Sequence, residues 1–306
     1  MPVLRLLGAQ VAIGAAAIFA RYALAGAGPL AVSALRLVIA ALAVLAIAGR
    51  LRRLSPRREA AFACAGVALA LHFATWIASL RYTSVAISTL LVTTTPVWTE
   101  LYDVARYRRP PARSYVVALA LALAGVASIA AARAGVPAPV PGHALAGAAL
   151  ALAGSIAIGA YLIVVREAGA TAEGGRLPTR AIVARTYGWA SLALVAASAA
   201  VHQGPPAASD LPAWGGVLAM ALGSQLLGHT AINAALRDFS PSTIALSTLL
   251  EPVVAALLAA WIFRETLSLP TALGGVLVLA AVATTLRAGS ATPLRRRRDA
   301  AATPRA

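Results

Sequence analysis

The sequence is poor in charge, contains no lysine and holds one cysteine. Charged residues make up 12% of its 306 residues, whereas soluble domains carry about 25%. Hydrophobic residues make up 60%, the mean hydropathy is +0.81, and the apolar residues fall in long runs. These proportions exclude a soluble domain and indicate a polytopic membrane protein. The single thiol, Cys64, cannot form an intramolecular disulfide or a cysteine-based metal site.

Because lysine is missing, the net charge of +16 comes from arginine alone. A chain this basic is a candidate for nucleic-acid binding. However, the arginines lie in loops between apolar segments and in the tail Arg295–Arg298. We therefore attribute them to membrane topology and expect no nucleic-acid partner. Arginine without lysine, together with abundant Ala and Gly, indicates a high-GC bacterial genome and hence the bacterial cytoplasmic (inner) membrane.

Motifs for ATP hydrolysis and for enzyme catalysis are also absent from the sequence. A Walker GxxxxGK[ST] motif is missing, so ATP is not the obvious source of energy. There is no HExxH motif, clustered Asp/His pair or nucleophile elbow, and the four histidines are scattered. We therefore expect no enzyme, no cofactor and no metal site. Besides a transporter, two functions remain open at this point: a receptor or assembly scaffold and, less favoured, a membrane-embedded enzyme.

Ten apolar segments each have about the 20 residues that a helix needs to cross a bilayer. Clusters of Pro, Gly and Arg separate them. We predict an all-α polytopic membrane protein with ten transmembrane helices, the first of which is retained rather than cleaved as a signal peptide. The predicted segments are 6–25, 29–49, 60–80, 84–102, 113–133, 142–165, 180–201, 212–235, 241–262 and 269–287.

The distribution of arginine predicts the orientation of these helices. If the N-terminus lies in the cytoplasm, twenty arginines fall in the cytoplasmic segments and three in the outer loops. Loops on the cytoplasmic side of a membrane carry the excess of positive charge. We therefore predict that both termini are cytoplasmic.

The two halves of the chain resemble each other. Arg81 and Arg237 each close an apolar segment, Pro96 and Pro252 each interrupt one, and both pairs are 156 residues apart. Five helices per half is an odd number, so the second copy must be inserted upside down. Inverted repeats are typical of transporters, because exchanging their two conformations gives alternating access to a central site. We predict repeats at 1–135 and 136–290, followed by an Arg-rich cytoplasmic tail without fixed structure at 291–306.

The residues at these positions resemble the EamA-type ten-helix carriers of the drug/metabolite transporter superfamily. The resemblance covers Leu6 to Arg287. It implies a secondary transporter that exports small metabolites, amino acids or drug-like compounds, driven by a proton gradient or by exchange. It also implies a small-molecule substrate, with H⁺ as an optional co-substrate. Because a ten-helix chain already contains both inverted halves and can work alone, we expect a monomer or homodimer in the lipid bilayer. One departure is Arg109, where the family often has an acid matching Glu265. The matching residues are Gly14, Ala15, Pro29, Arg36, Leu80–Ser84, Pro96, Val97, Gly228–Thr230, Asn233, Ala235–Arg237, Glu251–Val253, Phe263–Glu265, Gly274 and Gly275.

Polar residues near the centre of the apolar segments are the first site candidates. A charged group there is costly and seldom faces lipid. Glu251 is the strongest candidate. It either exchanges a proton during transport, or stays protonated and forms a hydrogen bond with a neighbour such as Gln225. Gln225, His229 and Asn233 are spaced four apart and lie near one helix face. They either line a substrate path or hold helices together.

Further candidates are aromatic and polar residues in other segments. Arg36 and Arg185 each follow a proline by seven residues, and each either binds an anionic group or reaches toward the membrane surface. Pro96 and Pro252 are predicted kinks and hinges. The remaining candidates for an apolar pocket with a few polar groups are His72, Trp76, Thr94, Trp98 and Tyr161.

Overall fold

The computed structural model describes residues 2–108, 110–132, 142–170, 175–263 and 267–290. Within these ranges the chain forms helices and no strand, and nine helical stretches are long and apolar enough to cross a membrane. The prediction of an all-α polytopic membrane protein is confirmed. The predicted tail 291–306, the predicted repeat boundary at 135–136, Arg109 and Glu265 lie outside the described residues.

The helices of the first half follow the predicted segments closely. They are α1 (Pro2–Gly14), α2 (Ala16–Gly26), α3 (Pro29–Ala48), α4 (Pro56–Tyr82), α5 (Val85–Val92), α6 (Thr95–Tyr107) and α7 (Arg113–Ala131). The first predicted segment is divided at Ala15 into α1 and α2, and the fourth is divided at Thr93 and Thr94 into α5 and α6. Helix α4 begins four residues before the apolar run, because its first turn is charged and lies outside the stretch that hydropathy detects.

The second half repeats this pattern. Its elements are α8 (Ala144–Gly169), α9 (Thr179–Ala200), α10 (Leu211–Ala219), the π-helix η1 (Met220–His229), α11 (Thr230–Ala235), α12 (Pro241–Ser247), the 3₁₀ turn η2 (Thr248–Leu250), α13 (Glu251–Phe263) and α14 (Leu269–Ser290). Helices α5, α6 and α7 begin 156 residues before α12, α13 and α14, respectively. The offset found in the sequence therefore also relates the helix boundaries, including the break between α5 and α6 and the break between α12 and α13.

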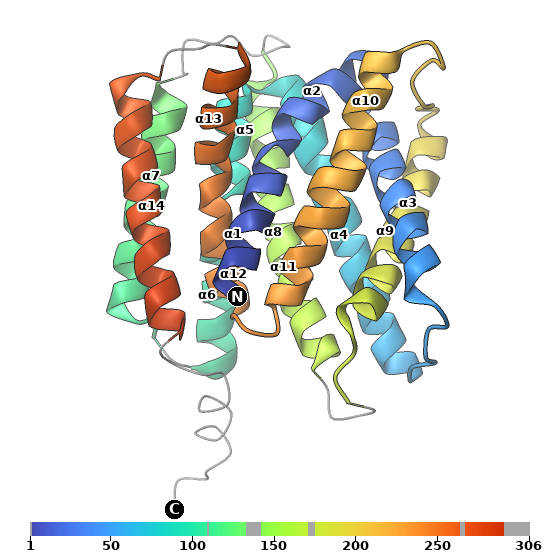
Figure 1. The fold of residues 1–306 in the computed structure, drawn as a ribbon, viewed down its shortest axis with the longest axis horizontal. Helices are drawn as coiled ribbons and strands as arrows, with labels where there is room; N and C mark the ends of the chain where they lie inside the picture. The colour runs from blue at the N-terminus through green and yellow to red at the C-terminus, as the bar shows by residue number, and fades with distance from the viewer. Residues whose placement is uncertain (1, 109, 133–141, 171–174, 264–266, 291–306) are drawn as a thin grey trace, which may run out of the picture.

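Helix packing shows that the two repeats are related by an approximate two-fold axis. Helix α7 packs on its own counterpart α14, and α3 on its counterpart α9. Helix α4 of the first repeat packs on α8 of the second. The corresponding contact with the repeats exchanged is made by α10 with α2 and by η1 with α1. Likewise α6 packs on α12 as α5 packs on α13. Figure 1 shows that α1 begins and α14 ends at the same, lower end of the bundle.

The breaks between α5 and α6 and between α12 and α13 have local causes. Pro96 and Pro252 each lie in the first turn after the break, where a residue without a backbone N–H is tolerated. The hydroxyl groups of Thr93, Thr94 and Thr95 donate to the carbonyl oxygens of Thr89, Leu91 and Val92, at 2.8, 2.7 and 2.9 Å, respectively. The carbonyls of Thr89 and Leu91 also accept backbone N–H bonds, from Thr93 and Thr94, whereas Pro96 has no N–H to donate to Val92. The hydroxyl of Thr95 thus supplies the bond that the proline removes.

The α7–α14 contact depends on two glycines. A Cβ atom added to Gly125 would lie 2.5 Å from the carbonyl oxygen of Gly274, and one added to Gly274 would meet the carbonyl of Gly125. Gly125→Ala is therefore expected to lower the free energy of unfolding by about 1–3 kcal/mol, because backbone must move apart. The thermal unfolding of purified protein in detergent measures the loss. The control Gly188→Ala, on α9, meets no atom of the described residues within 4 Å and should not destabilise the protein. Equal unfolding of the two variants would contradict the prediction.

Candidate functional site

A pocket lies between the two repeats, next to both helix breaks. It comprises about 560 Å³ of space free of protein atoms, part of which is open to the surroundings. Most of its wall is apolar, with a few charged, imidazole and hydroxyl groups, which is the usual composition of a small-molecule site. The lining residues are Ile13, Ala16, Arg36, His72, Phe73, Trp76, Val92, Thr93, Thr95, Ile158, Leu162, His229, Ile232, Thr248 and Glu251.

Arg36, on α3, is the buried cation of this pocket. Its side chain is fully buried, and its Nε donates to Oε1 of Gln225 at 2.9 Å. The guanidinium carbon lies 4.0 Å from the centroid of the Phe73 ring, a cation–π contact. Both terminal nitrogens are buried and have no hydrogen-bond partner among the described residues. The guanidinium group is thus held from one side, while the donors at its end are unused.

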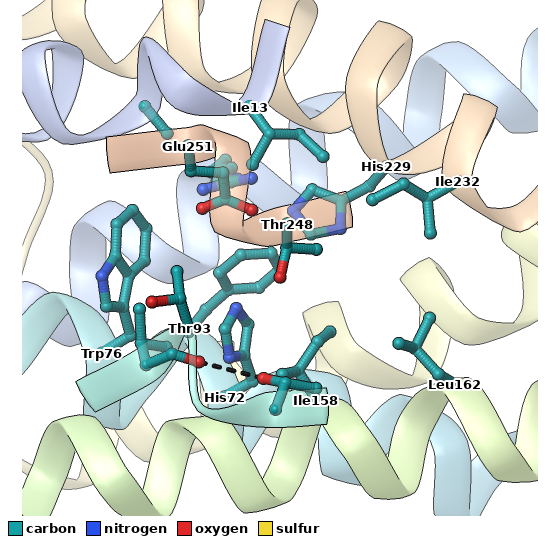
Figure 2. Close-up of a pocket in the computed structure, with 15 residues that line it drawn as sticks. Ile13, His72, Trp76, Thr93, Ile158, Leu162, His229, Ile232, Thr248 and Glu251 are labelled. Carbon is teal, nitrogen blue, oxygen red and sulfur yellow. Dashed lines mark hydrogen bonds between the residues drawn. The ribbon is translucent and has the colours of Figure 1, made fainter. Parts of the chain in front are cut away.

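Glu251 begins α13 and contributes a carboxyl group to the same pocket. Figure 2 shows it projecting into the space between Ile13, Trp76 and Thr248. The charges of Glu251 and Arg36 act on each other, although no hydrogen bond joins the two groups in this conformation. The predicted bond from Glu251 to Gln225 is not formed either, because Gln225 accepts from Arg36 and its own Nε2 has no partner in the part of the chain that the structure describes.

Two histidines and two aromatic rings form one wall. The Nδ1 of His72 lies 2.9 Å from the carbonyl oxygen of Gly154, which can only accept, so Nδ1 carries a proton. Trp76 stacks on His72 with ring centroids 6.1 Å apart and an interplanar angle of 5°. His229 lies edge-on to Phe73, at 5.2 Å between centroids, and no described residue bonds to its buried Nδ1. Figure 2 shows both imidazole rings turned toward the pocket.

Five of the sequence-predicted binding candidates meet in the pocket, and six do not. Those that line it are Arg36, His72, Trp76, His229 and Glu251. Of the others, Gln225 accepts a hydrogen bond from Arg36, and the hydroxyl of Tyr161 on α8 donates to Asn233 on α11 at 2.8 Å. Thr94 and Trp98 bond to Ser155 on α8, at 3.0 and 3.1 Å, respectively.

Sequence reasoning missed several lining residues. Thr93 and Thr95 line the pocket in place of the predicted Thr94, because the break between α5 and α6 changes the direction of successive side chains. Phe73 and Thr248 are also in the wall. The run Thr93–Thr95 next to Pro96 was the available signal for the hydroxyl groups. Phe73 gave none, since one Phe among apolar residues does not stand out.

Arg185 differs from Arg36, although the repeats relate the two positions. Its Nε donates to Oε2 of Glu59 at 2.9 Å, forming an ion pair, and its terminal nitrogens donate to the carbonyl oxygens of Ala181 and Arg52. Neither of the roles predicted from the sequence, an anion site or a side chain reaching toward the membrane surface, describes this arrangement. Arg185 fastens α9 to the first turn of α4.

Comparisons with known proteins agree with this architecture. The family described as "EamA-like transporter family" matches residues 1–131 and 145–287. Twenty-nine chains of solved structure match the fold. One of them, described only as "Crystal structure of protein", has a TM-score of 0.75 and 17% sequence identity, and the match covers 94% of this chain and 97% of that one. A comparison with curated proteins gave no match.

Proposed function

Because this chain belongs to the EamA-like transporter family, we propose that it is a secondary transporter that exports small metabolites, amino acids or drug-like compounds by alternating access. The observation that carries the proposal is the position of the pocket. It lies between inverted repeats, and both divided helices, α5–α6 and α12–α13, contribute residues to it. Substrate sites of transporters typically lie at such repeat interfaces and are built from discontinuous helices.

Alternating access follows from the approximate two-fold axis. Helices α6 and α12 meet at one end of the bundle, and their counterparts α5 and α13 meet at the other (Figure 1). If the repeats exchange conformations, the closed end opens and the open end closes, while the pocket stays in the middle. Pro96 and Pro252 serve as the hinges in this proposal, since both lie in the first turn after a break.

Glu251 is proposed to couple transport to protons, with simple exchange of metabolites as the alternative. It is an acidic residue of the pocket wall and lies in the field of Arg36. Gaining or losing a proton therefore changes the net charge that a substrate meets. A carboxyl group that titrates at the centre of a membrane protein is a common proton relay.

We further propose that the end of the bundle where α1 begins and α14 ends faces the cytoplasm of a bacterial cell, and that the protein works as a monomer or homodimer in the inner membrane. The arginine distribution supports this orientation. Thiol reagents that do not cross the membrane should label cysteines introduced between α9 and α10, but not those between α6 and α7, in intact spheroplasts. The opposite labelling pattern would reverse the topology.

Counterflow in liposomes tests the proposed function. Candidate metabolites come from comparing the contents of cells that express the protein or lack it. A labelled metabolite outside should enter liposomes preloaded with the same unlabelled compound, because a carrier accelerates exchange without net chemistry. Liposomes without protein are the control. Failure of every compound in such a panel would favour a receptor or scaffold, and chemical conversion of a compound would indicate an enzyme.

A further inference from the structure

The terminal nitrogens of Arg36 are buried polar atoms of the pocket wall to which no described residue bonds, as are Nε1 of Trp76 and Nδ1 of His229. A guanidinium group has five N–H donors, and only the one on Nε bonds to a described residue. A buried cation without hydrogen-bonded anions is costly. Gln225 and Phe73 fix the group in place but do not reach its two terminal nitrogens with an acceptor. The arrangement is that of a preformed receptor for an acceptor that comes from outside the chain.

The helix ends around Arg36 favour a negative charge at the same place. Helices α6 and α13 have 13 residues each and begin at Thr95 and Glu251, both of which line the pocket. The N-terminus of a helix carries a partial positive charge. The N–H of Glu251 itself donates to the carbonyl oxygen of Thr248, and Pro96 and Pro252 have no N–H, so the contribution of these helix starts is the charge rather than free donors. In transporters, the N-termini of divided helices commonly point at anionic groups of the substrate. The Nδ1 of His229 adds a further polar atom to this wall.

We propose that the substrate carries a carboxylate that binds the terminal nitrogens of Arg36, with its apolar or aromatic part against the ring wall of Phe73 and Trp76. This inference rests on the proposed transporter function and names its substrate class. A carboxylate matches the two parallel N–H donors of a guanidinium group. The apolar lining from α1, α8 and α11 suits a hydrocarbon body rather than a sugar or a polyamine.

The other titratable groups around Arg36 set the pH dependence of this binding. They are Glu251 from α13, Tyr187 from α9, His72 from α4 and His229 from η1. Of these, ionised Glu251 competes with an incoming carboxylate for the charge of Arg36. A neutral Glu251 removes that competition. Binding of a carboxylate is therefore expected to be tighter in mild acid than in mild alkali.

The test uses ligand pairs that differ only at the carboxyl group. The first pair is 3-phenylpropionate and 3-phenylpropionamide, and further pairs are small aromatic or aliphatic acids and their amides. Binding is measured by ligand-induced thermal stabilisation of the full-length protein in detergent. Wild type should bind at least one acid and bind its amide at least 10-fold more weakly. Arg36→Gln should bind that acid about 10- to 100-fold more weakly, the cost of losing hydrogen bonds to a charged group.

Two further variants keep the result interpretable. Arg185→Gln is the control: it makes the same substitution at the arginine that the repeats relate to Arg36, which already forms an ion pair with Glu59. This variant should bind acids as wild type does. Arg36→Lys keeps the charge without the planar fork, so it should bind acids more tightly than Arg36→Gln. If Arg36→Gln is too unstable to purify, the affinity of Arg36→Lys for acids is compared with that of wild type instead, and it should be weaker.

The failure of this inference is distinguishable from the failure of the transporter proposal. If counterflow identifies a transported compound that has no anionic group, or if Arg36→Gln exchanges the compound as wild type does, the carboxylate inference is overturned and transport stands. If no acid is bound in preference to its amide, the inference is also overturned. If no compound undergoes counterflow, the transporter proposal fails independently of any binding result.

Discussion

Glu251→Gln is expected to exchange substrate across liposomes while losing all accumulation driven by a pH gradient. The substitution keeps the size and polarity of the side chain but removes the group that gains and loses a proton. Counterflow needs only the pocket and the movement of the repeats, whereas uphill transport needs a titrating group. The expected change is a complete loss of gradient-driven accumulation, with counterflow of the same order as wild type.

The measurement compares accumulation and counterflow in the same proteoliposomes, with and without an imposed pH gradient. Glu167→Gln is the matched control, because Glu167 accepts from Tyr102 in an exposed contact outside the pocket. It should behave as wild type in both assays. If Glu251→Gln still accumulates substrate in response to the gradient, proton coupling through Glu251 is excluded. If wild type shows no such accumulation, the carrier works by exchange.

The architecture could be predicted from sequence because hydropathy and repeat offset depend on many residues at once. Long apolar runs separated by Pro, Gly and Arg located the helices to within a few residues. The offset of 156 joined Arg81 to Arg237 and Pro96 to Pro252, and it reappears in the starts of α5, α6 and α7 against α12, α13 and α14. Small errors at single positions do not change such a pattern.

The site was less predictable because it depends on where single side chains point. Gln225 and His229 are four residues apart, but only His229 lines the pocket, and the π-helix that carries both has no obvious cue in MALGSQLLGH. The same limit applies to Arg36 and Arg185, which occupy the same position relative to a proline. Glu59 reaches Arg185 from the charged first turn of α4, and no acid among the described residues bonds to Arg36 in this way. Long-range contacts of this kind are set by packing.

The two ends of the bundle differ in chemistry, although the backbone repeats. Where α6 meets α12, the hydroxyl of Tyr115 on the neighbouring α7 donates to the carbonyl oxygen of Ser242, and the hydroxyl of Ser242 donates to Asp103, both at 3.2 Å. The residues that the offset of 156 relates to Tyr115, Ser242 and Asp103 are Thr271, Ala86 and Ala259, respectively. Because alanine has no polar side-chain atom, the sequence cannot repeat the Ser–Asp hydrogen bond at the other end. In this conformation hydrogen bonds therefore join α6 and α7 to α12 at one end of the bundle.

Tying α6 to α12 is therefore expected to stop transport. In a Cys64→Ala background, Asp103→Cys with Ser242→Cys places two thiols where the side-chain oxygens now lie 3.2 Å apart. Joining them with an oxidant or a short bifunctional thiol reagent should abolish counterflow, because α6 and α12 can no longer take the arrangement of α5 and α13. A reducing agent should restore it.

The single-cysteine variants under the same oxidant, and the double variant kept reduced, are the controls and should exchange substrate. Counterflow of the crosslinked protein at the rate of its reduced form would show that α6 and α12 do not separate during transport. The two-fold exchange of conformations would then be the wrong description of alternating access in this carrier. Loss of transport on crosslinking, in contrast, would locate one gate at Asp103 and Ser242, where α6 meets α12.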